Sequence, residues 1–96
     1  MPYIVPKQRA MLDPLIEQLS CMVGDLCEPE NGTVQDPDGM LNYVFTKMLI
    51  DMGLSRYIKL ERAVGILECC KLELYRKAAA PYEDKKALDN GEVYQS

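Results

Sequence analysis

The chain has no histidine and no tryptophan, and only one phenylalanine among its 96 residues. Without histidine it lacks the commonest general base and the commonest side-chain ligand of transition metals. No apolar run reaches the roughly 20 residues of a membrane-spanning helix. No glycine-rich loop opens a helix in the pattern that cradles phosphate. We therefore expect a binding protein and not an enzyme, with no catalytic residue, metal or cofactor.

Charge and size narrow the class of partner. Eleven basic and fifteen acidic residues give a net charge of −4, which argues against duplex nucleic acid, because such binding depends on neutralising phosphates. A small phosphorylated ligand held by a few local arginines stays compatible. The N-terminus lacks the basic and then apolar pattern of a signal peptide, so we expect a cytosolic protein without a membrane partner. One domain, residues 1–96, is expected, and self-association would help to bury its apolar surface.

Apolar residues recur at helical spacing in three segments, and no segment alternates as a strand would. After a short helical turn over residues 7–12, the first helix is expected to begin with Asp13 as its N-cap and Pro14 at its first position. It should end near Cys27. Residues 28–38, which contain two prolines, one glycine and several acids, are expected to form an acidic loop.

The second expected helix runs from an Asp38 cap to about Met52, and Gly53 is its stop. Its apolar residues form the most regular stripe in the sequence, so we expect them to be core. They are Met40, Leu41, Val44, Phe45, Met48, Leu49 and Met52.

The third expected helix spans residues 56–80. Leu60, Leu67 and Leu74 recur at intervals of seven, and such a seam could pair with its own copy. Gly65 is unfavourable inside a helix and suggests a close crossing with another helix. The sequence thus predicts an all-α, small three-helix domain that assembles at least as a homodimer through the third helix.

The C-terminal part is expected to add a short helix. Pro81 should stop or restart the third helix, and Asn90 and Gly91 should end the last helical piece. Residues 91–96 then form a tail that is ordered only by docking. The four cysteines are expected to be reduced and buried: Cys21, Cys27, Cys69 and Cys70.

Ionisable and phenolic groups gather on the third helix and near it. The candidate ligand-binding residues are Asn42, Arg62, Glu68, Lys71, Tyr75, Arg76 and Tyr82. In the functional interpretation the basic groups contact a phosphate, a tyrosine stacks on a ring, and Asn42 reads the edge of that ring. In the alternative, Glu68 pairs with Lys71 and Glu73 with Lys77 along the helix, and Asn42 bonds to a neighbouring helix.

A magnesium-dependent nucleotide hydrolase is a further alternative. All-helical nucleotide pyrophosphohydrolases hold magnesium with acids at Glu-x-x-Glu spacing. Here Glu61, Glu68 and Glu73 are separated by seven and five residues. Glu61 and Glu68 share a helix face but lie two turns apart, which is too far for one ion.

Several segments resemble small uncharacterised proteins encoded by tailed bacteriophages, over nearly the whole chain. They are Met1-Pro-Tyr-Ile, Leu41-Asn-Tyr, Arg62-Ala-Val-Gly-Ile-Leu-Glu, Lys71-Leu-Glu-Leu-Tyr-Arg, Pro81-Tyr-Glu-Asp and Asn90-Gly-Glu-Val-Tyr. The resemblance implies a viral origin and expression in the cytoplasm of a host bacterium. It brings no activity.

Two functional hypotheses follow for a phage protein of this size without a catalytic constellation. In the first, a homo-oligomer counters host defence by sequestering a nucleotide immune signal between its subunits. In the second, the chain inhibits a host defence or replication protein by direct contact. The clustering of arginine and tyrosine favours the first, and the net negative charge and the acidic loop favour the second.

Overall fold

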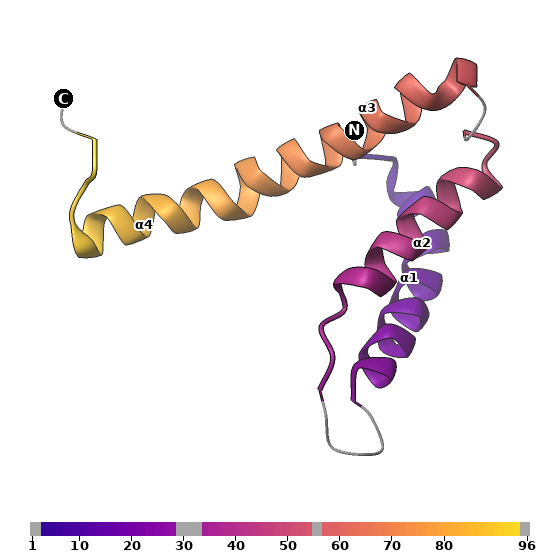
Figure 1. Ribbon diagram of the computed structural model, residues 1–96, viewed down its shortest axis with the longest axis horizontal. Helices are drawn as coiled ribbons and strands as arrows, with labels where there is room; N and C mark the ends of the chain where they lie inside the picture. Colours follow the sequence, from indigo (N-terminus) through magenta and orange to yellow (C-terminus); the bar gives the residue numbers. More distant parts are fainter. Residues whose placement is uncertain (1–2, 29–33, 55–56, 95–96) are drawn as a thin grey trace.

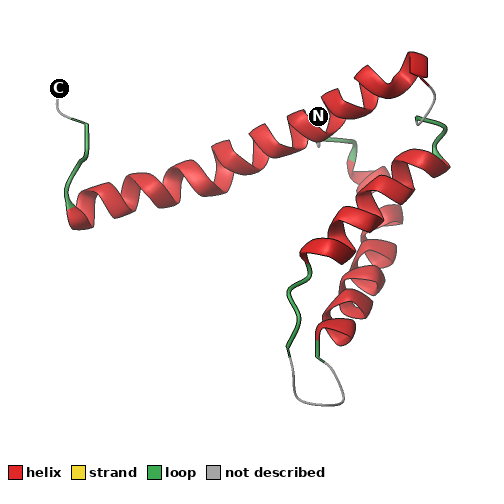
Figure 2. Ribbon diagram, viewed as in Figure 1, coloured by secondary structure: helices red, strands yellow, loops and turns green. Residues whose placement is uncertain are grey.

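The computed structural model describes residues 3–28, 34–54 and 57–94, except for the side chains of residues 57 and 58. Its helices are α1 (Pro6–Cys27), α2 (Asp38–Asp51), α3 (Tyr57–Leu74), the π-helical turn η1 (Tyr75–Ala79) and α4 (Ala80–Asn90). The described residues contain no strand, so the all-α class is confirmed (Figure 2).

The helices α3, η1 and α4 follow one another without a break and form one rod (Figure 1). Its 34 residues, from position 57 to position 90, span about 50 Å at 1.5 Å per residue. The rod does not stop at Pro81, but the α-helix resumes there as α4, which holds Pro81 in its first turn. The prediction that Pro81 restarts the helix is therefore confirmed. The N–H of Ala80 bonds to the carbonyl of Tyr75, five residues earlier. Proline lacks an N–H and crowds the carbonyl four residues before it, and a wider turn just ahead of Pro81 lets the helix continue.

A single helix, α1, replaces the turn and shorter helix that were expected at the N-terminus. Pro14 lies inside it, so the predicted start at Asp13 is wrong. The proline that starts the helix is Pro6, which follows an extended Val5 and occupies the first turn. Proline favours this position because its missing N–H would have no helical partner there.

The helix α2 ends as the sequence predicts. Gly53 has a φ of +73°, and its N–H bonds to the carbonyl of Ile50 at 2.9 Å. The N–H of Leu54 bonds to the carbonyl of Leu49 at 2.9 Å. This pair of bonds is a Schellman motif, which favours glycine because the backbone is left-handed there. At the other end Pro37 is the cap and Asp38 is the first helical residue, one position from the expected start.

The helix α4 ends at Gly91, which has a φ of +97° and bonds through its N–H to the carbonyl of Ala87 at 2.9 Å. This end was predicted correctly. Beyond it, Val93 and Tyr94 are exposed, so the described part of the tail does not dock on the rest of the chain.

The helices α1 and α2 form a hairpin that projects from the rod, and α2 returns in the direction from which α1 came (Figure 1). Between them, Gln35 donates its N–H to the carbonyl of Cys27 at 2.9 Å. The described parts of the loop, Glu28 and residues 34–37, are non-helical as expected; residues 29–33 lie outside the described part.

One chain alone buries almost no core. Among the described residues, only Val23 and Ala63 are buried. The radius of gyration is 17.7 Å, against roughly 12.5 Å for a compact domain of this length. The predicted core of α2 is therefore wrong for the single chain, where Phe45, Met48 and Met52 are exposed.

The cysteines and the leucine seam are also uncovered. All four cysteines are free, as expected, but Cys21 and Cys70 are exposed, so the prediction that they are buried is wrong. Leu60, Leu67 and Leu74 are exposed too. No helix within the described segments combines the length and hydropathy needed to span a bilayer.

Candidate functional site

A groove of about 880 Å³ follows α3 into η1. It is lined by Tyr3, Arg62, Gly65, Ile66, Cys69, Cys70, Glu73, Leu74 and Lys77. At 100° per residue, the lining residues from 62 to 77 fall within about half of the helix circumference. Small and apolar side chains make up its middle, and charged groups lie toward its ends.

Gly65 leaves an open strip in this groove. A Cβ placed on Gly65 would meet no heavy atom within 4 Å. The close helix crossing expected at this glycine is therefore not formed among the described residues of one chain. The open space at Gly65 leaves room for a second protein surface to approach the backbone of α3.

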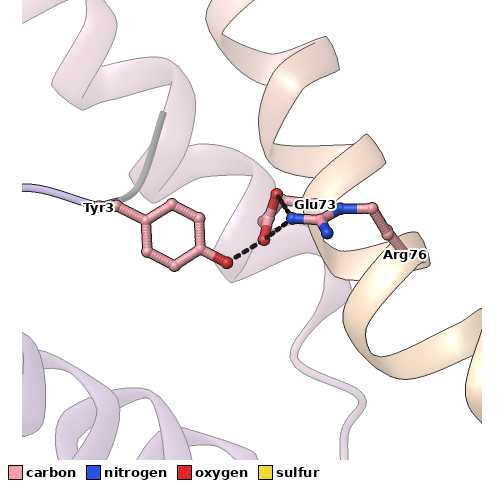
Figure 3. A network of polar contacts seen from close by, with 3 residues as sticks. All are labelled: Tyr3, Glu73 and Arg76. Carbon is pink, nitrogen blue, oxygen red and sulfur yellow. Dashed lines mark hydrogen bonds and ion pairs between the residues drawn. The ribbon is translucent and has the colours of Figure 1, made fainter.

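A polar network ties the N-terminal segment to the rod (Figure 3). The hydroxyl of Tyr3 donates a hydrogen bond to Glu73 Oε1. Arg76 donates from Nη2 to both carboxylate oxygens of Glu73, at 2.9 and 3.0 Å. The Glu73 side chain is only 19% exposed, so this network occupies most of its accepting capacity.

The network also fixes the charges of its members. The hydrogen bond from Tyr3, followed by the one from Arg76, holds the pKa of Glu73 below its ordinary value. The same bond raises the pKa of Tyr3, because the carboxylate retains the phenolic proton. Glu73 raises the pKa of Arg76 in turn. At neutral pH the three groups are a phenol, a carboxylate and a guanidinium, and their charges sum to zero.

Arg62 and Lys77 lie toward opposite ends of the groove. Fifteen positions separate them, or about 22 Å along a helix. Within the described part of the chain, ion pairs join Lys47 with Asp51, Lys71 with Glu68, and Arg76 with Glu73; none includes Arg62 or Lys77. Because Arg76 neutralises Glu73, the charge of the groove that remains unbalanced is positive, although the whole chain is acidic.

The seven candidate residues do not converge on one pocket within a single chain. Arg62 lines the groove, and Arg76 lies beside it, bonded to Glu73. Glu68 and Lys71 form an ion pair at 3.2 Å, as the intrahelical alternative predicts. At 100° per residue they lie with Tyr75 on the side of α3 away from the groove. The other expected pair is wrong, because Glu73 bonds to Arg76 and not to Lys77.

The remaining two candidates lie on other helices. Asn42 is an exposed residue of α2 and accepts a hydrogen bond from Thr46 Oγ1 at 3.5 Å. Tyr82 is on α4, with the Lys86 ammonium 5.7 Å from its ring centre. Neither lines the groove. The described residues hold no group of three or more acids and cysteines placed for a metal ion.

Sequence reasoning missed several residues of the groove. Ile66, Cys69 and Glu73 follow Arg62 at intervals of four, three and four, a spacing that keeps side chains on one helix face. That periodicity could have identified them. Tyr3 is 70 positions from Glu73, and no local pattern signals its contact.

A family model described as a domain of unknown function, DUF6899, matches residues 1–93. The chain belongs to the DUF6899 family. Every residue of the groove, from Tyr3 to Lys77, lies inside the matched DUF6899 region. No curated protein and no solved structure matches the chain.

Proposed function

We propose that this DUF6899 chain is a non-enzymatic binding protein that captures a small phosphorylated ligand of the nucleotide class in the α3 groove, as an assembly of identical subunits. One observation carries this proposal. An acidic chain holds an open, largely apolar groove in which Arg62 and Lys77 form no ion pair within the described residues.

The groove has the parts that such a ligand needs. Its volume of about 880 Å³ falls within the roughly 300–1,000 Å³ that is usual for small-molecule sites. The planar guanidinium of Arg62 can donate two parallel hydrogen bonds to a phosphate. Ile66 and Cys69 make the middle of the groove apolar. Glu73 lies one turn from Lys77, and Arg76 neutralises its charge there.

The wider role in our proposal is that of a phage protein which removes a nucleotide immune signal from the cytoplasm of its bacterial host. The support is the resemblance to phage proteins, together with a groove suited to binding and not to turnover. Sequestration needs only affinity, so no general base is required. Of the seven candidate residues, this proposal keeps Arg62, which lines the groove, and Arg76, which lies beside it.

A binding experiment tests this function directly. A panel of nucleotides, including ADP, ADP-ribose and cyclic dinucleotides, is screened by thermal shift and then by calorimetry. A ligand at 100 times its dissociation constant should stabilise the folded chain by about 2.7 kcal/mol. After heating, mass spectrometry should recover that ligand unchanged. A panel without any shift would contradict the proposal, and chemically altered ligand would point to the magnesium-dependent hydrolase.

A second candidate, inhibition of a host protein by direct contact, is favoured by the apolar side chains that the α1–α2 hairpin exposes. They include Leu15, Ile16, Met22, Phe45 and Met48. If this hairpin contacts a host protein, Met48→Asp should abolish capture of one defined partner from lysate while nucleotide binding is unchanged. Capture that survives Met48→Asp would count against the hairpin.

A further inference from the structure

We propose that a second copy of this chain closes the α3 groove by packing antiparallel across a twofold axis between Cys69 and Cys70. In this arrangement Arg62 of one copy and the partner subunit's Lys77 flank the same phosphate. The dimer then holds two equivalent anion sites, and neither is complete in one chain. This inference rests on the proposed function and names the interface and the register.

The exposed surface supports a second copy as the occupant. The chain exposes 8927 Å², whereas a compact monomer of its mass would expose roughly 5,600 Å². The excess of about 3,300 Å² is larger than the roughly 1,200–2,000 Å² of total surface that a stable interface buries. A second copy exposes the same apolar surface, so packing the two copies together would bury apolar surface on both chains.

The groove itself indicates the register. Its helical lining extends from Arg62 to Lys77, so its midpoint lies between Cys69 and Cys70. A twofold axis at the midpoint covers the whole groove in both copies. It brings the partner subunit's Leu74 level with Gly65 along the helix axis, on the other edge of the groove. Gly65, where a Cβ would meet nothing, leaves its own edge open to the partner helix.

Charge explains why an anion belongs in this interface. The same register sets Arg62 against the partner subunit's Lys77, and two cations at close range repel. Glu73 offsets only part of the repulsion: Tyr3 and Arg76 already bond to its carboxylate and, together with Lys77, lower its pKa. A phosphate between the two cations would offset the rest. Sliding the axis by two residues would instead pair Arg62 with the partner's Glu73 and leave no anion site.

A single cysteine distinguishes the two registers. The test chain keeps Cys70 and carries Cys21→Ser, Cys27→Ser and Cys69→Ser. In the proposed register the two Cys70 residues are offset by about 1.5 Å along the helices, and in the shifted register by about 7.5 Å. Mild oxidation should give a disulfide-linked dimer within the proposed register only. A matched chain with Cys70→Ser and Lys71→Cys, on the opposite face, should stay uncrosslinked.

Inorganic pyrophosphate tests the anion sites. Sedimentation should show that pyrophosphate strengthens the dimer, with two equivalents bound per dimer. Lys77→Gln should weaken pyrophosphate binding by about tenfold, as expected for loss of a charged hydrogen bond. Circular dichroism should show that this variant keeps the helical content of the parent chain.

The outcomes separate this inference from the proposed function. A chain that binds nucleotide as a monomer would overturn the second copy but leave the function standing. A dimer that crosslinks through Cys70 but ignores pyrophosphate and every nucleotide would overturn both the anion sites and the proposed function. Failure of Cys70 to crosslink in a stable dimer would overturn the register.

Discussion

The two faces of α3 treat their charges differently. Away from the groove, Glu68 and Lys71 pair with each other at 3.2 Å, with most of both side chains in solvent. Along the groove, Arg62 and Lys77 flank apolar residues and form no ion pair within the described residues. An exposed intrahelical pair contributes only a few tenths of a kcal/mol and needs no partner. Binding of a ligand or of a second copy should therefore be more favourable on the groove face than on the opposite face.

Assembly gives the largest expected difference between these faces. Ile66→Asp places a carboxylate on the groove, whereas Val64→Asp places one on the surface away from it. Each Ile66 buried in the dimer is worth about 1.5–3 kcal/mol, so losing two should raise the dimer dissociation constant at least 100-fold. Val64→Asp should change it little. Sedimentation equilibrium measures both, and equal effects would show that the groove is not the interface.

Ligand affinity should separate the faces by a smaller factor. Arg62→Gln removes a cation from the groove, and Lys71→Gln removes one from the paired face. A charged hydrogen bond contributes about 1.5–3 kcal/mol, so Arg62→Gln should weaken ADP binding about tenfold or more. Lys71→Gln should leave it within a factor of two. Calorimetry with ADP decides this, and a larger loss for Lys71→Gln would reverse our assignment of the two faces.

The helix ends show which parts of this fold were readable from sequence. Gly53 and Gly91 end their helices with positive φ, and glycine adopts this conformation without a Cβ penalty, so one residue suffices to predict the stop. The prolines were harder to interpret. Pro6 starts a helix, Pro14 lies inside one, and Pro81 follows a π turn in a continuous rod. The three prolines have the same intrinsic backbone preferences. Whether the helix begins, continues or changes its winding at each one depends on the neighbouring structure.

The candidate site could be predicted from the sequence only in part. Helical spacing alone places Arg62, Ile66 and Cys69 on one face. The contact of Tyr3 with Glu73 joins residues 70 positions apart, so it depends on how the N-terminal segment folds back on the rod. The expected core failed for a related reason. Apolar spacing identifies the face that will be buried, but it does not say whether the same chain or another one covers it.

Substituting Gly65 should have opposite effects on the stability of the monomer and on the stability of the dimer. Gly65→Ala adds a methyl group where no heavy atom lies within 4 Å, and alanine is more favourable in a helix by about 1 kcal/mol. The monomer should therefore become more stable, as urea unfolding at low protein concentration would show. The dimer should become weaker, because the methyl group would stand in the open strip along which the partner helix approaches. As a control, Gly53→Ala should destabilise the monomer, because φ is positive there.

If both stability and assembly rise in Gly65→Ala, the glycine does not lie at a close contact. That result would favour the part of the leucine seam that lies outside the groove, Leu60 and Leu67, as the place where copies meet. The exposed side chains of that seam are available in the single chain. Pyrophosphate would distinguish these two possible interfaces. It should strengthen a dimer formed through the groove, and it should have no effect on a dimer formed through the leucine seam.

The smallest effect should come from Tyr3→Phe, which removes the hydroxyl that fastens the N-terminal segment to Glu73. Because the bonds are near the surface, we expect a small decrease in the unfolding midpoint at pH 7. The difference should depend on pH in both directions. The pKa of Glu73 is lowered from its ordinary 4.5, so its contribution is complete above pH 4.5 and is lost as the pH falls through the lowered value. The pKa of Tyr3 is raised from 10.0, so its contribution is complete below pH 10 and is lost as the pH rises through the raised value.

Thermal unfolding of the parent and Tyr3→Phe across this pH range measures the difference. Tyr43→Phe is the matched control, because Tyr43 is exposed on α2 and has no part in the side-chain hydrogen bonds among the described residues. Its midpoint should follow the parent at every pH. A Tyr3→Phe difference that persisted at pH 2 would mean that the hydroxyl holds the segment through a bond that does not require ionised Glu73. The groove would then keep its wall when Glu73 is protonated, and Arg76 would be free to join Arg62 and Lys77 as a third cation for an anionic ligand.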